Sequence, residues 1–240
     1  MNRIIYKRKS VRKYQPQSLD DTAMGQIRAL IEGAKPLFPQ IPYSVEIVPN
    51  TKPGKGSPLS FLVFSSEEQE GFLENIGFVG QQISLGLSAI GLGSCWRMGR
   101  PEGQMLSQHP FVISMAFGLP AEALFREQSQ FKRKPLSRIS EGQDSRLEAA
   151  RLAPSGLNAQ DWFFMADKGK IYCYRKKPNP LMAKMKNRMN CIDMGIALCH
   201  IAQESQDFYY SRETNYPEVG GYIYMGTVEQ RHGGANSKAD

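Results

Sequence analysis

The sequence predicts an α+β fold built from two tandem, diverged copies of a helix-strand-strand-helix-strand unit. Helical and strand patterns follow one another in the same order before and after about residue 140. Three pairs of positions in corresponding elements are 109 residues apart: Val63 and Tyr172, Gly86 and Gly195, and Met115 and Tyr224. A constant offset between like elements is typical of an internal duplication. Residue identity between the copies is low, so a chance match of common elements is the alternative.

The chain length and charge leave several classes of protein open. With 240 residues, the chain can form one large domain or two packed halves around a buried core. We place the halves at residues 1–140 and 141–240, packed as one globular unit. The net charge of +7 would suit nucleic acid, an anionic surface or a phosphate-bearing small molecule, so charge alone does not identify a partner.

The first half is predicted to contain a helix at 22–34, strands at 43–48 and 60–64, a long helix at 69–89 and a strand at 110–120. Ser18 and Asp20 or Asp21 can cap the first helix, and YSVEIV alternates as a half-buried strand does. Small residues of the long helix permit close packing against another helix. They are Gly77, Gly80, Ser84 and Ser88.

The second half is predicted to contain a helix at 145–154, strands at 161–166 and 170–174, a long helix at 187–205 and a strand at 221–226. The most apolar stretch of the chain, 76–96, is interrupted by Gln81 and Gln82, which favours a buried helix over a membrane span. The N-terminus lacks the pattern of a secretory signal, and the four cysteines lack metal-ligand spacing. We therefore expect a cytoplasmic protein with reduced thiols and no metal.

RKSVR, residues 8–12, is the first stretch that indicates binding chemistry. In an extended segment, side chains two residues apart share a face, so Arg8, Ser10 and Arg12 are expected to point the same way. Two guanidinium groups and a hydroxyl on one face can bind a phosphate or the carbonyl oxygens of a polar heterocycle. The alternative is a basic N-terminus that is merely solvated.

Three further stretches carry basic, glycine-rich or polar patterns. FKRKPLSR (131–138) presents basic side chains beside a stiffening proline, although these can also be plain surface charge. GLGSCW (91–96) can bring backbone amides close to a flat ligand, but it follows a helix and so does not fit a Rossmann glycine loop. RLAPSGLNAQDWFF (151–164) ends a helix and offers Ser155 and Asn158 before a strand.

Together these motifs resemble the FMN-dependent nitroreductase family, and the likeness spans roughly residues 4–226. The resemblance implies a nitroreductase-like fold, FMN as cofactor and NAD(P)H as electron donor. Hydride would pass through flavin N5 to a small electron acceptor such as a nitroaromatic or a quinone, without a named catalytic acid or base. The implied cofactor-binding residues are Arg8, Lys9, Ser10, Arg12, Gly93, Ser94, Arg133, Pro154, Ser155, Gly156 and Asn158.

The order of the motifs departs from that of ordinary nitroreductases, in which the Pro-Ser turn follows soon after RxSxR. Here that position holds GAKPLFPQIP, and aligning the helix ends places Pro36 on Pro154 and Leu37 on Ser155. Asp161 also replaces the family's proline. Ordinary members are homodimers with FMN at the interface. The chain therefore resembles the TM nitroreductase subgroup, a single-chain pseudo-dimer with one flavin site, so that a monomer could complete the site.

Two other functions stay open at this point. A protein that binds flavin without turnover would carry the same motifs. A basic nucleic-acid-binding protein could use the segments rich in Lys and Arg, but Phe and Tyr mostly sit in strand patterns rather than in a recognition module. We therefore expect a small-molecule partner, and neither nucleic acid nor a membrane.

Overall fold

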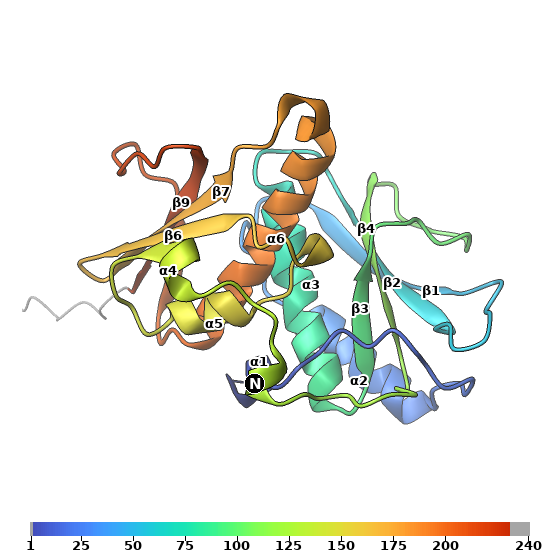
Figure 1. Cartoon of the computed structure of the whole chain (residues 1–240). Helices are drawn as coiled ribbons and strands as arrows, with labels where there is room; N and C mark the ends of the chain where they lie inside the picture. The colour runs from blue at the N-terminus through green and yellow to red at the C-terminus, as the bar shows by residue number, and fades with distance from the viewer. Residues whose placement is uncertain (1, 231–240) are drawn as a thin grey trace, which may run out of the picture.

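The computed structural model describes residues 2–230, in which two sheets flank a central pair of long helices (Figure 1). The first half contains α2 (Asp21–Gly33), β1 (Tyr43–Pro49), β2 (Ser60–Ser66), α3 (Phe72–Ala89), β3 (Gly93–Arg97) and β4 (Phe111–Gly118). The second half contains α5 (Leu147–Leu152), β6 (Trp162–Asp167), β7 (Lys170–Lys176), α6 (Ala183–Gln203), β8 (Phe208–Ser211) and β9 (Tyr222–Gln230). The short elements are α1 (Asn2–Ile5), η1 (Gln128–Gln130), α4 (Leu136–Ile139), β5 (Ser140–Glu141), η2 (Gly156–Asn158) and η3 (Pro180–Met182).

The two sheets have the same strand order. The first is β1-β2-β4-β3, and the second is β6-β7-β9-β8 with β5 added beside β6. The strands pair antiparallel except for the parallel pair β5 and β6. Each half therefore repeats the order helix-strand-strand-helix-strand-strand, which confirms the predicted α+β fold and adds one strand to each predicted unit.

The two additional strands, β3 and β8, have weak sequence signals. β3 begins within GLGSCW, four positions after the end of α3, and β8 has four residues. Both are edge strands that pair on one side only. Short edge strands need few alternating residues, so neither shows the period-two pattern on which strand prediction depends.

The long helices α3 and α6 lie between the sheets (Figure 1), and they contact each other at two glycines. A Cβ atom on Gly77 would overlap the carbonyl oxygen of Ile192, and one on Gly195 would overlap that of Glu74. The two contacts are equivalent, because Gly77 and Gly195 are 118 positions apart and so are Glu74 and Ile192. The central helices of the two halves are therefore related by an offset of 118.

The helix pairing predicted at an offset of 109 is wrong. Gly86, predicted to match Gly195, packs instead against the side chain of Leu30 in α2. The strands do follow a smaller offset, since β2 begins at Ser60 and β7 at Lys170. The hairpin connections lower the offset between the first and second strands, because residues 50–59 join β1 to β2 whereas only 168–169 join β6 to β7. The offset rises again at the central helices, because Gly195 lies 19 positions after the end of β7 whereas Gly77 lies 11 positions after the end of β2.

The small residues of α3 lie on two different faces of the helix. Gly77 lies at the crossing with α6, as predicted. A Cβ atom on Gly80 would instead meet the ring of Trp96, and the Ser84 hydroxyl bonds that of Ser94 at 2.8 Å. The expectation that Gly80 and Ser84 face the other long helix is therefore wrong, because both contact β3 of their own half.

The ends of the predicted elements are set by local contacts. Asp20 caps α2, since its carboxylate accepts a hydrogen bond from the backbone N of Ala23 at 2.8 Å. Near the predicted boundary at residue 140, α4 contacts α5 and β6, and β5 pairs with β6. Residues 231–240 of the predicted second half lie outside the described residues.

Candidate functional site

The N-terminal arm, residues 7–15, lies between β3 and the segment that follows β4. The backbone N of Val11 donates to the carbonyl of Ser94 at 3.0 Å, and the N of Arg126 donates to the carbonyl of Lys7 at 2.9 Å. Gly93 permits this approach, since a Cβ atom there would lie 2.6 Å from the side chain of Val11. The fold thus brings the RKSVR and GLGSCW motifs together, although the close neighbour of Gly93 is the arm itself.

Arg8 is a buried cation that pairs with no carboxylate of residues 2–230. Its side chain donates to the Ser10 hydroxyl at 3.0 Å, but its Nε and Nη1 are buried and have no partner within residues 2–230. Burial, then the charges of Arg126 and Arg133, lower the pKa of Arg8 to about 9. Nε of Arg126 is also buried without a hydrogen-bond partner among the described residues, although this guanidinium lies over the ring of Phe131. The site therefore concentrates positive charge and N–H donors that an anion could satisfy.

Lys9 and Arg12 make different contacts from Arg8. Lys9 pairs with Glu122 at 3.2 Å, and Glu122 also accepts from the backbone N of Arg12 at 2.7 Å. That backbone hydrogen bond is the main cause of the lowered pKa of Glu122. The Arg12 side chain is exposed. Glu122 thus fixes the path of the arm, on which Arg8 is buried and Ser10 half-buried.

Arg133 joins the basic 131–138 segment to the turn after α5. Its Nε and Nη2 donate to the carbonyls of Ala153 and Leu152 at 3.0 and 3.3 Å, and its Nη1 donates to Oδ1 of Asn158 at 2.6 Å. Burial, then Arg126, lower the pKa of Arg133 to about 10. Two predicted site residues, Arg133 and Asn158, are therefore in direct contact.

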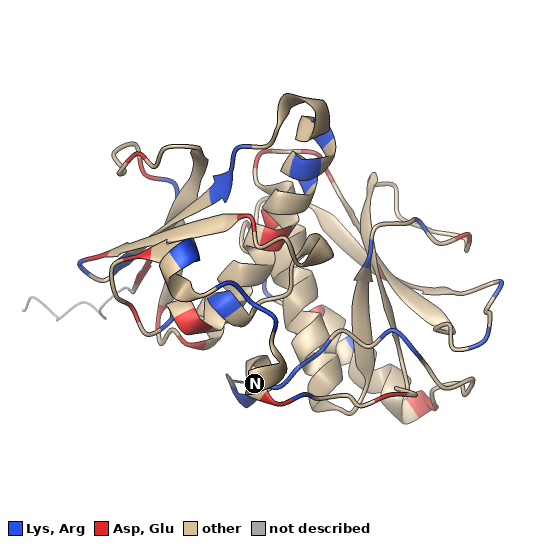
Figure 2. Ribbon diagram, in the orientation of Figure 1, with Lys and Arg blue, Asp and Glu red and all other residues tan. Residues whose placement is uncertain are grey.

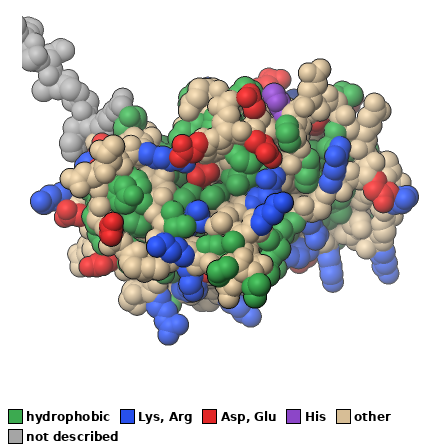
Figure 3. All heavy atoms as spheres, turned by 90° about the horizontal axis from the view of Figure 1, so that it is seen from above, with side chains coloured by type: hydrophobic (Ala, Val, Ile, Leu, Met, Phe, Trp, Pro, Cys, Tyr) green, Lys and Arg blue, Asp and Glu red, His purple; other side chains and the backbone are tan. Residues whose placement is uncertain are grey.

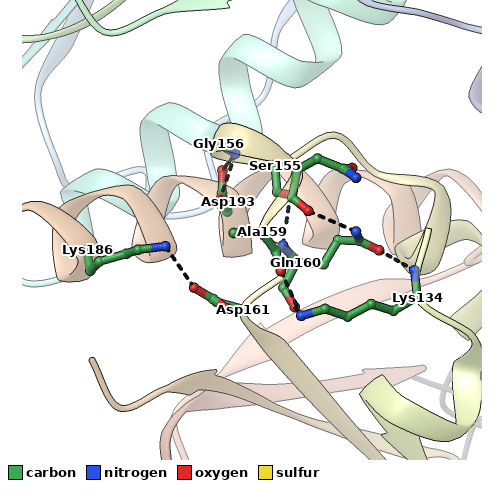
Figure 4. A network of polar contacts seen from close by, with 9 residues as sticks. Lys134, Ser155, Gly156, Ala159, Gln160, Asp161, Lys186 and Asp193 are labelled. Carbon is green, nitrogen blue, oxygen red and sulfur yellow. Dashed lines mark hydrogen bonds and ion pairs between the residues drawn. The ribbon is translucent and has the colours of Figure 1, made fainter. Parts of the chain in front are cut away.

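The turn at residues 155–160 has a strained backbone that polar groups hold in place (Figure 4). Leu157, Asn158 and Gln160 have φ angles of 53, 56 and 49°, which are uncommon for residues other than glycine and often occur at functional sites. The backbone N of Gln160 donates to the Ser155 hydroxyl at 3.0 Å, and its Oε1 accepts from the backbone N of Lys134 at 2.7 Å. Gln160 and Lys134 therefore belong to the site, and Gln160 was not among the predicted site residues.

Asp193 on α6 supports the same turn and was also not predicted. Both of its carboxylate oxygens accept from the backbone N of Gly156, at 2.9 and 3.0 Å. Burial, with a smaller effect of the nearby Asp161, raises the pKa of Asp193 to about 7, against the lowering effects of the Gly156 hydrogen bond and of Lys186. The available signal was an acidic residue within the apolar run CIDMGIALC.

Replacing Asp193 by asparagine is expected to remove a pH dependence of folding stability. A folded-state pKa of about 7 exceeds the ordinary carboxyl value, about 4. The stability due to this group is complete below pH ~4 and is lost as the pH rises to ~7, by on the order of 4 kcal/mol. Urea denaturation of the two proteins from pH 4 to 8 measures the difference. Parallel stability curves for the two proteins would contradict the expectation.

The structure arranges the predicted residues in two adjoining clusters. One holds Arg8 and Ser10 beside β3, where the Ser94 hydroxyl bonds Ser84. The other holds Arg133 with the turn, in which a Cβ atom on Gly156 would clash with Met189. Basic positions mark both the arm and the segment leading into α4 (Figure 2). The charge of Arg133 acts on Arg8, so the clusters lie close together.

Other features of the described chain lie apart from these clusters. A groove of about 580 Å³ is lined by residues of α2, β1 and β2, and none of the predicted site residues lines it. Within residues 2–230, no group of His, Cys, Asp and Glu side chains is arranged to hold a metal ion, and no helix is long and apolar enough to cross a membrane. Cys95, Cys173, Cys191 and Cys199 are free thiols.

The family model and the solved structures that match this chain point to the same family. A family model described as "Putative TM nitroreductase" matches residues 1–205. A solved structure described as a "putative nitroreductase" from Thermotoga maritima is similar over 95% of this chain and 91% of its own, with 22% identity and a TM-score of 0.65. A search of the curated proteins gives no match.

Two further solved structures match a smaller part of the chain. An FMN-dependent nitroreductase from Clostridium difficile covers 60% of this chain and 100% of its own, with 15% identity and a TM-score of 0.44. A "putative nitroreductase in complex with FMN" from Desulfovibrio desulfuricans covers 59% and 96%, with 18% identity and a TM-score of 0.44. The family model matches most of the length of this chain, and the Thermotoga maritima structure has the same fold as this chain. The chain therefore belongs to the TM nitroreductase family.

Proposed function

We propose that the chain is an FMN-dependent oxidoreductase of the nitroreductase type, which takes hydride from NAD(P)H and passes it to a small acceptor such as a nitroaromatic or a quinone. The observation that carries the proposal is the buried guanidinium of Arg8, whose Nε and Nη1 have no partner within residues 2–230. A buried charge is unfavourable unless it is paired. Family membership supports the type of reaction.

The residues around Arg8 fit the phosphate of FMN. Arg126 and Arg133 lie close enough to lower its pKa, and within residues 2–230 no carboxylate bonds any of these three guanidinium groups. The Ser10 hydroxyl adds a further polar group. Guanidinium groups match phosphate oxygens in geometry and charge. By resemblance to the family, the 155–160 turn would hold the flavin ring.

Bound FMN would supply the two-electron chemistry of the reaction. The protein's own contribution is to bind the cofactor, orient it and stabilise negative charge. Arg8 and Arg133 provide that charge stabilisation from a buried and a half-buried position, where electrostatic interactions are stronger than in water. Gly156, Asn158 and Gln160 give the turn a fixed shape through their hydrogen bonds. None of these roles requires a side chain that donates or abstracts a proton.

The equivalent position in the first half is occupied by an aromatic side chain. Phe38 lies 118 positions before Gly156, the offset that relates α3 to α6. Its ring contacts Tyr210 edge-on, with centroids 6.0 Å apart, and approaches Gly71 so closely that a Cβ atom there would lie 2.6 Å from it. This packing supports a pseudo-dimer in which the two halves, 1–140 and 141–240, share one flavin site.

The holoprotein is expected to be a 27.0 kDa monomer that is yellow and binds one FMN per chain. The reason is that one set of flavin motifs is complete and the contact between the halves is internal. Absorbance, phosphate analysis and light scattering on dilute holoprotein measure both quantities. Two FMN per chain would contradict the single site. Loss of flavin in step with dissociation of a dimer would contradict the pseudo-dimer.

Turnover separates an enzyme from a protein that only binds flavin. The holoprotein should oxidise NADH or NADPH when a nitroaromatic or a quinone is present, and bound flavin without oxidation would favour the non-catalytic alternative.

On the face shown in Figure 3, Lys and Arg side chains are interspersed with acidic and hydrophobic ones. That face is therefore not a continuous basic surface of the kind that binds nucleic acid.

A further inference from the structure

We infer that Asp193 is a positioning residue for the proposed flavin site, because its carboxylate holds the 155–160 turn in the shape that receives the flavin. The inference rests on the proposed function. Asp193 is 4% exposed, and both carboxylate oxygens lie within hydrogen-bond distance of the backbone N of Gly156 (Figure 4). Asp193 would not touch the cofactor and would act through the backbone of the turn.

The same hydrogen bond occurs in the first half with a different residue type. Oδ1 of Asn75 on α3 accepts from the backbone N of Phe38 at 3.0 Å. Asn75 and Asp193 are 118 positions apart, and so are Phe38 and Gly156. The contact is therefore a repeated feature of the fold. The half that keeps the polar turn has a carboxylate at this position, and the half that lost the turn has an amide.

The turn depends on such support because its backbone is unfavourable by itself. Three of its residues have positive φ and are not glycine. Leu157 at its tip is 84% exposed and so adds little packing. Ser155 and Lys134 hold the end of the turn at Gln160. Asp193 holds the opposite end at Gly156.

The hydrogen bond to Gly156 requires an oxygen acceptor at position 193, and this acceptor does not have to be charged. Asp161, at the entry to β6, lies near it and adds negative charge, and Lys186 on α6 pairs with Asp161 at 3.2 Å. Asn75 shows that an amide oxygen can accept the equivalent N–H. An isosteric Asp193→Asn change should therefore keep the turn in shape, whereas Asp193→Ala removes the acceptor and leaves the Gly156 N–H unpaired.

Three variants of the full chain test the inference: Asp193→Ala, Asp193→Asn and Asn75→Ala. FMN affinity is measured by flavin fluorescence titration, and hydrogen exchange of amides 155–160 is measured without FMN. Asp193→Ala should speed exchange in the turn and weaken FMN binding by about tenfold or more. Asp193→Asn should restore both to near the wild-type values. Asn75→Ala, the matched control, should lower thermal stability and leave FMN affinity unchanged.

Several results would overturn the inference. These are unchanged exchange of the turn in Asp193→Ala, faster exchange with unchanged FMN affinity, or an equal loss of affinity in Asn75→Ala. The last result would mean that general stability, and not the shape of the turn, controls binding. A wild-type chain that binds no FMN would refute the proposed function. The exchange measurement on FMN-free protein would still decide whether Asp193 holds the turn.

Discussion

Replacing Gly195 by alanine is expected to lower the free energy of unfolding by about 2–4 kcal/mol. The new Cβ atom would overlap the carbonyl oxygen of Glu74 and lie 2.9 Å from the backbone N of Phe78. These are backbone atoms of the partner helix, so relief requires moving the helices apart across a close-packed core. Guanidinium denaturation of the FMN-free protein measures the loss.

Replacing a glycine by alanine should instead raise the free energy of unfolding at another place in the chain. Gly25 lies within α2, and a Cβ atom there has no neighbour within 4 Å. Gly25→Ala should therefore stabilise the protein by up to about 1 kcal/mol, the difference in helix propensity. Gly77→Ala should match Gly195→Ala, because the two glycines are equivalent at the crossing. If Gly195→Ala behaved like Gly25→Ala, the helices would not pack at these glycines.

Much of the fold is predictable because its signals are local. The Asp20 cap, the alternation of β1 and the proline after α5 each set an element from neighbouring residues. The match between the halves was predicted less well. The hairpin at 50–59 is longer than that at 168–169, and α6 extends further before its crossing glycine than α3 does, so strands and central helices have different offsets. No periodicity within a single element reports these differences. The glycines that identify the true helix offset are recognisable only from the contact that they make.

In the candidate site, too, local features could be predicted from the sequence and tertiary contacts could not. Its motifs occur as contiguous residues, so the arm and the turn could be identified from the sequence. The residues that hold them come from elsewhere in the chain. Asp193 reaches the turn across 37 positions, and Gln160 bonds the backbone of Lys134 across 26. Arg126 was missed because its neighbours in sequence give no sign of its proximity to Arg8. Tertiary contacts of this kind leave no pattern in a single sequence.

Replacing Arg8 by methionine is expected to change FMN binding and apoprotein stability in opposite directions. FMN affinity should fall by roughly tenfold to a hundredfold, since a charge-assisted hydrogen bond contributes about 1.5–3 kcal/mol. The FMN-free protein should become more stable, because a buried guanidinium beside Arg126 and Arg133 is unfavourable. Its lowered pKa, about 9, has this cause. The unfavourable contribution is present below pH ~9, where the group is charged, and lessens as the pH rises further.

The comparison with Arg3→Met isolates the role of burial in this result. Arg3 lies in α1, five positions before Arg8, and is exposed, so its replacement should leave both FMN affinity and stability nearly unchanged. Fluorescence titration with FMN and thermal unfolding of the apoproteins measure the two effects. If Arg8→Met lowered both quantities together, Arg8 would be structural. If affinity stayed at the wild-type value, the phosphate of FMN would bind elsewhere. If the Arg8 guanidinium binds the phosphate of FMN, Arg8→Met should lower FMN affinity and raise the stability of the apoprotein.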